Sequence, residues 1–325
     1  MEPTPCLLCG ADAYTVVHTG PDYLLRRPGA YRLVRCRRCG LIYQNPRPPL
    51  AAMSRFYPDS YGAYGSAAGG LRARRGALGA LIRHGQGRRA WMLDRAVPPT
   101  PGRARRVLDV GCASGLFLEA MQARGWAVAG VEPNAAAARA TSARLAAPVF
   151  AGPLEHARFP AASFDAVTLW DVLEHFHDPL VNLRALRRIL RPGGAIFVRV
   201  PNADSYVARL AGRYWVGYDQ PRHMAVFTPE TLLRMLQEAG FGAPRALFFS
   251  ASYLAASHSL RFALDDRAGP RLAAAVHRAL YSPAARAVAG LPFRLADRVW
   301  GGAAVEVLAL ACHGDGMIGR EQSDA

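Results

Sequence analysis

The sequence predicts an α/β protein: a doubly wound, mostly parallel sheet with helices on both faces, and a small cysteine-rich module before it. Three observations carry this prediction. From residue 105 onward, short apolar runs alternate with helix-like segments. A glycine-containing loop follows the first apolar run. Two C-x-x-C pairs lie within the first 40 residues. Half of the 325 residues are hydrophobic, which is enough for a sizeable core.

The elements of the main domain follow in order from hydrophobic pattern, capping residues and glycines. Helices are expected over 114–124, after Asn134, after Asp178-Pro179, and from Thr228-Pro229 to Gly240. About 50 residues with helical periodicity separate the last two strands. Strands are expected at 107–110, 127–132, 148–152, 164–170, 195–200, 246–254 and 305–312.

Composition changes along the chain divide it into three parts. Residues 1–60 are expected to form the cysteine module, and 61–98 a connector rich in Gly, Ala and Arg that ends in a short helix near 88–96. Residues 99–325 are expected to form the main domain, with a lid-like insertion at about 255–303.

The charge balance favours anionic partners. Forty arginines, no lysine and 24 acidic residues give a net charge of +16. No basic segment followed by an apolar core begins the chain, and no run reaches the ~18 apolar residues of a membrane-spanning helix. A cytoplasmic protein without a transmembrane segment is therefore expected. Such a protein could still contact a membrane surface peripherally, through the apolar and arginine positions of the insertion.

The loop RVLDVGCASG indicates the ligand of the main domain. A diphosphate loop would not be preceded by a carboxylate, but Asp109 stands two residues before Gly111. Glu132 ends the next strand, 23 residues later, where an acid can accept both hydroxyls of a ribose. A phosphate-free nucleoside with a cationic amino-acid tail fits this pattern, so the predicted cofactor is S-adenosylmethionine. The alternative is a glycine turn with two solvated acids.

Four successive stretches resemble the motifs of class I S-adenosylmethionine-dependent methyltransferases: RVLDVGCASG, GVEPN, FPAASFDAVTLWDVLEHFHDP and LRRILRPGGAIFVRVPN. The resemblance covers about residues 100–250 and the last strand. It implies a seven-stranded Rossmann-like sheet whose last strand is antiparallel. Ala113 stands where this family usually has glycine, and its methyl group calls for a negative φ. The implied cofactor residues are Asp109, Gly111, Cys112, Ala113, Gly115, Glu132, Pro133, Leu154, Glu155 and Asp171.

The cysteine pairs Cys6/Cys9 and Cys36/Cys39 are each followed by glycine and predict a four-thiolate structural zinc site. Redox-active pairs are the alternative. With CGLIYQNPRP and RFYPDSYGAY, this region resembles the N-terminal zinc-ribbon extension of methyltransferases often linked to sugar and surface-glycan biosynthesis.

Histidines that follow the fourth and fifth strands are the candidate catalytic residues. His223 is the first candidate for a general base or acceptor contact, and His175 the second. Asp171, Glu174 and His175 resemble the acidic cluster of ubiquinone-pathway O-methyltransferases, which is associated with a divalent cation, so a cation there is an additional candidate. Arg222 and Arg213 are candidates for holding an anionic group of the acceptor.

The predicted reaction is O-methylation of a sugar or other small, sugar-like or anionic metabolite. Three alternatives remain: sugar C-methylation, because Tyr218-Asp219-Gln220-x-x-His223 resembles a segment of zinc-ribbon sugar C-methyltransferases; RNA methylation; and a non-catalytic binding module. A nucleic-acid acceptor is disfavoured because no Asn-Pro-Pro-aromatic motif follows the fourth strand. The oligomeric state is left open.

Overall fold

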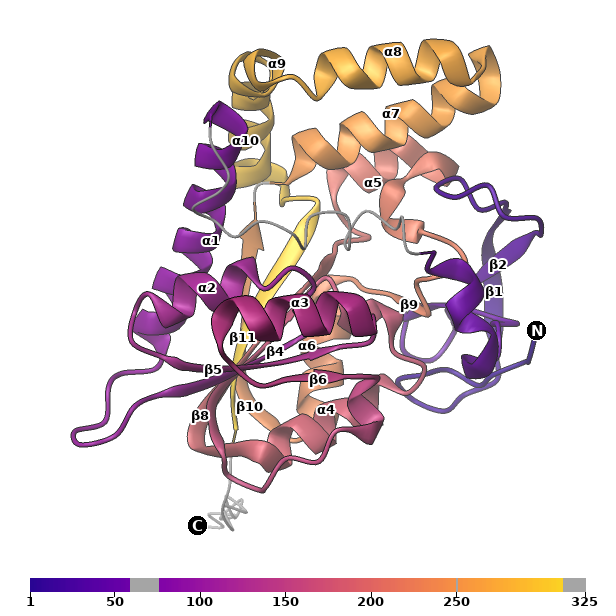
Figure 1. Ribbon diagram of the computed structural model, residues 1–325. Helices are drawn as coiled ribbons and strands as arrows, with labels where there is room; N and C mark the ends of the chain where they lie inside the picture. Colours follow the sequence, from indigo (N-terminus) through magenta and orange to yellow (C-terminus); the bar gives the residue numbers. More distant parts are fainter. Residues whose placement is uncertain (59–75, 250, 312–325) are drawn as a thin grey trace, which may run out of the picture.

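A seven-stranded sheet occupies the centre of the molecule (Figure 1), in the order β10-β11-β8-β7-β4-β5-β6. The computed structural model describes residues 1–58, 76–249 and 251–311. Strands β4 to β8 pair in parallel, and β11 runs antiparallel to both of its neighbours, which confirms the predicted topology. The strands are β4 (Arg106–Val110), β5 (Ala127–Glu132), β6 (Val149–Ala151), β7 (Phe164–Trp170), β8 (Leu190–Pro201), β10 (Phe241–Phe249) and β11 (Ala304–Ala311).

Helices cover both faces of this sheet, because its central strands are apolar on both sides. One core cluster joins the sheet to α1 (Gly76–Ala96), α2 (Leu116–Gln122) and α3 (Ala135–Leu145). The other joins it to α4 (Pro179–Ile189) and α6 (Pro229–Glu238). The carboxyl ends of the parallel strands therefore meet at one edge of a rigid core, where ligands bind in such sheets.

Helix ends follow the capping residues in most cases. The Asn134 side chain accepts a hydrogen bond from the backbone N–H of Ala137 at 2.9 Å, and Thr228 and Thr231 form a capping box. The Asp178 side chain makes no capping bond, although α4 does begin at Pro179. The proline alone fixes that boundary because its φ suits the first helical turn.

The N-terminal region forms a second sheet that includes a strand from the main domain. Its order is β1 (Tyr14–Gly20), β2 (Tyr31–Cys36), β3 (Ile42–Gln44) and then β9 (Ala225–Val226). A 3-10 helix, η1 (Leu50–Phe56), follows β3. Because β9 lies about 180 residues after β3 and pairs with it, the two regions share one sheet.

A helical insertion lies between β10 and β11 at the top of Figure 1. It consists of α7 (Ser252–Ala268), α8 (Pro270–Leu280), α9 (Pro283–Val288) and α10 (Gly290–Trp300). The strand expected over 246–254 instead ends at Phe249, because α7 already begins at Ser252. None of the helices in the described ranges is long and apolar enough to cross a bilayer.

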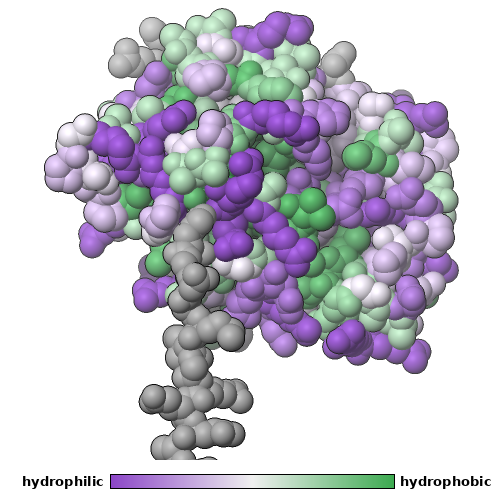
Figure 2. All heavy atoms as spheres, turned by 90° about the horizontal axis from the view of Figure 1, so that it is seen from below, coloured by the Kyte–Doolittle hydropathy of each residue, from purple (hydrophilic) through white to green (hydrophobic). Residues whose placement is uncertain are grey.

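The connector also differs from expectation. Helix α1 begins at Gly76, well before the expected start near residue 88, and its alanines and arginines are good helix formers. Residues 59–75 of the predicted connector lie outside the described part of the chain. On the face opposite the helical insertion, hydrophilic residues form most of the rim and hydrophobic residues gather along a band near the middle (Figure 2).

Candidate functional site

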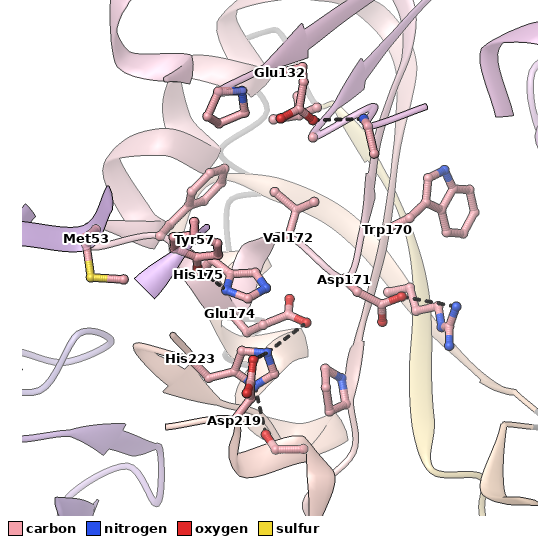
Figure 3. A pocket seen from close by; sticks show the side chains of 18 of the residues that line it. Met53, Tyr57, Glu132, Trp170, Asp171, Val172, Glu174, His175, Asp219 and His223 are labelled. Carbon is pink, nitrogen blue, oxygen red and sulfur yellow. Dashed lines mark hydrogen bonds and ion pairs between the residues drawn. The ribbon is translucent and has the colours of Figure 1, made fainter. Parts of the chain in front are cut away.

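A cavity of about 1170 Å³ opens at the carboxyl ends of β4, β5 and β7. Typical sites for one small molecule occupy roughly 300–1,000 Å³, so this cavity can hold a cofactor and an acceptor side by side. Figure 3 shows side chains from both ends of it. One end, the glycine-loop half, is lined by Gly111, Ala113, Glu132, Pro133 and Leu154. The other end, the histidine half, is lined by Tyr57, Glu174, His175, Asp219 and His223.

Glycines of the loop after β4 are fixed by close contacts and by backbone conformation. Gly111 has φ 69°, and a Cβ there would lie 2.6 Å from a Val172 methyl carbon. Gly115 has φ 64°, and its Cβ would lie 2.4 Å from a methyl carbon of Thr141. Ala113 has φ 45°, which corrects the expectation of a negative φ. The backbone at Ala113 therefore adopts the left-handed conformation that glycine usually occupies, at a conformational free-energy cost of about 1–2 kcal/mol.

Glu132 links the loop to the following strand. One carboxylate oxygen accepts from the backbone N–H of Ala113 and the other from that of Asn134, both at 2.8 Å. The side chain is almost fully buried, and burial raises its pKa. Each oxygen keeps a further lone pair, so the carboxylate can hold the loop and still accept ligand hydroxyls.

The predicted cofactor residues separate into two groups. Asp109 is buried behind the loop, where it accepts a hydrogen bond from the Thr168 hydroxyl at 2.6 Å, and burial raises its pKa to about 7. Cys112 is buried against Gly130. These two residues and Gly115 support the loop from behind. The residues that line the cavity are Gly111, Ala113, Glu132, Pro133, Leu154, Glu155 and Asp171.

His175 lies at the far end of the cavity and is held by two partners. Its Nδ1 is 2.9 Å from the Tyr57 hydroxyl and 3.1 Å from the carbonyl oxygen of Arg222. A carbonyl can only accept, so this contact assigns the ring proton to Nδ1. Burial and the neighbouring His223 lower the pKa of His175 to about 3, so the ring is neutral at physiological pH.

His223 faces His175, with ring centroids 4.6 Å apart. Its Nδ1–H donates to the carbonyl oxygen of Gly217 at 2.8 Å, which leaves the lone pair on Nε2. Nε2 lies 3.9 Å from an Asp219 carboxylate oxygen and 4.0 Å from one of Glu174 (Figure 3). Burial lowers the pKa of His223, although Asp219 opposes that shift. The site thus holds a neutral imidazole whose Nε2 can accept a proton next to a carboxylate.

Glu174 is the least satisfied group of this half. It is almost fully buried, and within the described part of the chain neither carboxyl oxygen has a hydrogen-bond partner. Burial and the nearby Asp171 raise its pKa well above the usual value. The cation set inferred from the sequence is corrected in one member: Glu174 and His175 group with His223, with donor atoms within 4.8 Å of one another. Asp171 instead pairs with Arg199 at 3.2 Å.

Arg222 does not face the acceptor, contrary to expectation. Its guanidinium is fully buried and donates to both oxygens of Asp22 at 2.7 and 2.8 Å and to both oxygens of Asp219 at 2.6 and 3.0 Å. Burial alone would raise the pKa of Asp219, but its hydrogen bonds with Arg222 bring it below the usual value. Arg213 lies near the surface beside Tyr214 and Asp266. Neither arginine lines the cavity.

The N-terminal region forms part of the histidine half, which the sequence analysis did not predict. Leu24, Met53 and Tyr57 line the cavity, together with Trp215 and Leu254. The loop after β7 is tied to the same region, since His177 lies 3.0 Å from the carbonyl oxygen of Pro48. The pairing of β9 with β3 brings the N-terminal side chains to the cavity. No short sequence pattern predicts this pairing.

The four predicted cysteines come together in the N-terminal region. The Cys6 and Cys39 sulfurs are 3.4 Å apart, those of Cys9 and Cys36 are 3.5 Å apart, and all four lie within 4.8 Å of one another. Four sulfurs about 2.3 Å from a tetrahedral zinc would lie roughly 3.8 Å apart, so the donor set fits this metal. Burial alone would raise the pKa of Cys36, but backbone N–H groups of Cys39 and Arg38 lower it to about 7.

Comparison with known proteins agrees with this geometry. A family model described as a methyltransferase domain matches residues 83–243. A ubiquinone biosynthesis O-methyltransferase from Thiobacillus denitrificans is 30% identical over 162 residues, which cover 46% of this chain and 68% of the relative. One of the same name from Aeromonas salmonicida is 32% identical over 149 residues, covering 42% of this chain and 62% of the relative.

A solved structure of a SAM-dependent methyltransferase from Archaeoglobus fulgidus is 19% identical, with a TM-score of 0.44, and covers 69% of this chain and 94% of that one. The sequence relatives, the family model and the observed sheet topology agree with one another. The chain therefore belongs to the class I S-adenosylmethionine-dependent methyltransferases.

Proposed function

We propose that this enzyme methylates a hydroxyl group of a small acceptor, with the glycine-loop half holding S-adenosylmethionine and His223 receiving the hydroxyl proton. The observation that carries the proposal is the Nε2 lone pair of His223, exposed to the cavity and flanked by carboxyl groups. When bound, the cofactor supplies an electrophilic methyl group on a sulfonium. Glu132 suits the ribose and Leu154 the adenine, since both line the same half of the cavity.

His223 and its neighbours are arranged for one proton transfer. When bound, the cofactor would supply the methyl group to the acceptor oxygen and would keep the electron pair of the broken carbon–sulfur bond on its sulfur. The hydroxyl proton passes to Nε2 of His223, and the Asp219 carboxylate 3.9 Å away stabilises the imidazolium. His175, with its pKa near 3, stays neutral and positions the acceptor together with Tyr57.

The lining of the histidine half supports a small acceptor with one polar and one apolar side. The lining combines the polar groups of Glu174, His175 and His223 with apolar side chains that include Met53 and Trp215. A sugar fits such a surface, because its hydroxyls can meet the polar side and its ring face the apolar side. The curated relatives are named O-methyltransferases, which favours oxygen as the methylated atom over carbon.

An acceptor panel tests this proposal. The purified enzyme is given isotopically labelled S-adenosylmethionine with nucleotide sugars, free sugars, phenols and short RNA, and products are located by mass spectrometry. The expected result is labelled methyl ether formation on a small hydroxyl compound. Label on carbon would support sugar C-methylation instead, and label in RNA would support the nucleic-acid alternative. No cofactor binding in calorimetry would leave a non-catalytic module.

The same panel, repeated after chelation, separates the two roles available to the histidine cluster. If His223 acts as a base, chelator treatment that leaves the zinc content of the four-cysteine site intact also leaves the rate unchanged. If Glu174, His175 and His223 hold a divalent cation, the rate falls and is restored by added metal. Because these groups can accept either a proton or a cation, only this comparison assigns the role.

We further propose that the four cysteines bind a structural zinc ion, as thiolates kept reduced in the cytoplasm. Four sulfur ligands leave no position for water, so the metal would support the fold and take no part in the transfer. Elemental analysis is expected to give one zinc per chain, and a Cys36→Ser variant less. A metal-free protein with two disulfides would support the redox alternative.

A further inference from the structure

The helical insertion has apolar residues on two opposite sides. Its inner side belongs to the cavity, which Leu254 and Ala255 of α7 help to line. Its outer side carries large apolar side chains exposed to solvent: Val288 at the end of α9 is 77% exposed and Val299 near the end of α10 is 72% exposed. Such outward apolar groups contribute nothing to the core, so they point to a binding surface.

On α10 the exposed groups form a stripe. Leu291, Leu295 and Val299 are spaced four residues apart, so they lie along one face of the helix. The opposite face packs against the protein: the ring centroids of Phe293 and Tyr253 lie 5.5 Å apart, and Asp297 is buried. We call the outward face of Val288, Leu291, Leu295, Val299 and Trp300 the α9–α10 stripe.

Positive charge accompanies the stripe. Residues 270–300 contain five arginines and a single acid. That acid, Asp297, is turned inward and accepts a hydrogen bond from the Tyr206 hydroxyl at 3.3 Å. Arg294 and Arg298 are exposed, and each lies three residues after a stripe leucine, so they border the stripe along one edge. The outer surface of α10 is therefore apolar and cationic with no exposed carboxylate of its own.

We propose that the α9–α10 stripe docks the enzyme onto an anionic lipid bilayer. Leu291, Leu295 and Val299 would enter the headgroup region, Trp300 would lie at the interface, and the bordering arginines would contact lipid phosphates. A protein partner with an apolar groove would not by itself account for the absence of acids along the segment, whereas an anionic membrane does. The edge-to-face packing of Phe293 on Tyr253 ties the docking helix to α7, which lines the histidine half of the cavity.

Vesicle co-sedimentation of the full chain tests the proposal without requiring catalysis. Vesicles of phosphatidylcholine alone are compared with vesicles that also contain phosphatidylglycerol, at low and high salt. The expected result is binding to the anionic vesicles that weakens with salt. The Leu295→Asp/Val299→Asp variant is expected to bind the anionic vesicles at least about tenfold more weakly. It removes two apolar side chains and adds two negative charges that the anionic lipids repel.

A control uses Val181→Asp, which adds one of the two negative charges of the stripe variant at a 60% exposed valine on α4, in the part of Figure 1 opposite the insertion. It is expected to bind like the parent. Circular dichroism confirms that each variant is folded. Absence of vesicle binding, or equal binding by the stripe variant, would overturn the proposal. So would a concentration-dependent dimer in light scattering that the stripe substitutions abolish, because the stripe would then join two copies of the chain.

Discussion

The glycine-loop half of the cavity is formed by loops that directly follow β4, β5 and neighbouring strands, whereas the histidine half is assembled from distant segments. In the first, Glu132 accepts from the backbone N–H groups of Ala113 and Asn134, and backbone hydrogen bonds of the loop also stay within residues 111–134. In the second, Tyr57 meets His175 across 118 residues and Asp22 meets Arg222 across 200. A locally built site tolerates change elsewhere in the chain, but a site built from distant parts depends on each of them.

The family model reflects the same division. It matches residues 83–243, which contain the whole loop after β4 and both histidines. Residues 1–58, which supply Tyr57 and Asp22, and the insertion from α7 to α10 lie outside it. The glycine-loop half is thus built on the part that matches the family model, and the histidine half combines that part with two additions.

The largest effect is expected from His223, which we propose as the proton acceptor of the histidine half. His223→Ala should lower kcat by about 10²–10⁴-fold, the usual contribution of a positioned base, and leave S-adenosylmethionine affinity unchanged. His223→Asn is the matched variant: its side-chain amide can still donate to the Gly217 carbonyl oxygen but cannot accept the proton. If both variants keep nearly the full rate under steady-state assay, His223 is not the base.

A large loss of stability is expected at Arg222, which joins the two regions. Arg222→Met leaves Asp22 and Asp219 as buried carboxylates without their cation, which should lower the free energy of unfolding by about 3–5 kcal/mol. Urea unfolding measures this. Arg213→Met, at an exposed ion pair, is the control and should leave stability nearly unchanged. Equal effects of the two variants would mean that the buried pairs do not hold the regions together.

A smaller, local effect is expected in the glycine-loop half. Glu132→Gln removes the charge that accepts from two backbone N–H groups and, as proposed, from the ribose. Cofactor affinity in calorimetry should fall roughly 10- to 100-fold, the range for hydrogen bonds to a charged group. Glu119→Gln, at an acid that pairs with Arg144 outside the cavity lining, serves as the control. Unchanged affinity in the Glu132 variant would place the ribose elsewhere.

The smallest effect is a shift in the pH profile. Burial lowers the pKa of His223 below 6.5, so the neutral, proton-accepting form persists to a lower pH than for a free imidazole. The value of kcat/KM should therefore be constant near neutral pH and fall only below pH 6.5, as Nε2 becomes protonated. A decline that begins well above 6.5 would contradict a buried neutral base, and the residual rate of His223→Asn should lack this acidic limb.

Prediction from the sequence succeeded where function is encoded locally. The seven strands, the N-cap at Asn134 and the grouping of four cysteines follow from short patterns of hydrophobicity, capping and spacing. It failed where a contact crosses the chain. Arg222 was expected to hold an anionic acceptor but is buried between Asp22 and Asp219, and Asp171 was expected in a cation cluster but pairs with Arg199.

By itself the sequence determined the order of strands and helices, the glycine loop with its two acids, and the cysteine cluster. Residues close in the chain are enough to fix the alternation of a strand, the conformation of a turn and the spacing of a C-x-x-C pair. Tertiary structure alone decided that β9 pairs with β3, that Tyr57 meets His175, and that the α9–α10 stripe faces solvent. The physical reason is that these contacts join segments that are far apart in the sequence. They depend on how those segments pack in the folded protein, and the residues next to each one in the chain do not determine its distant partner.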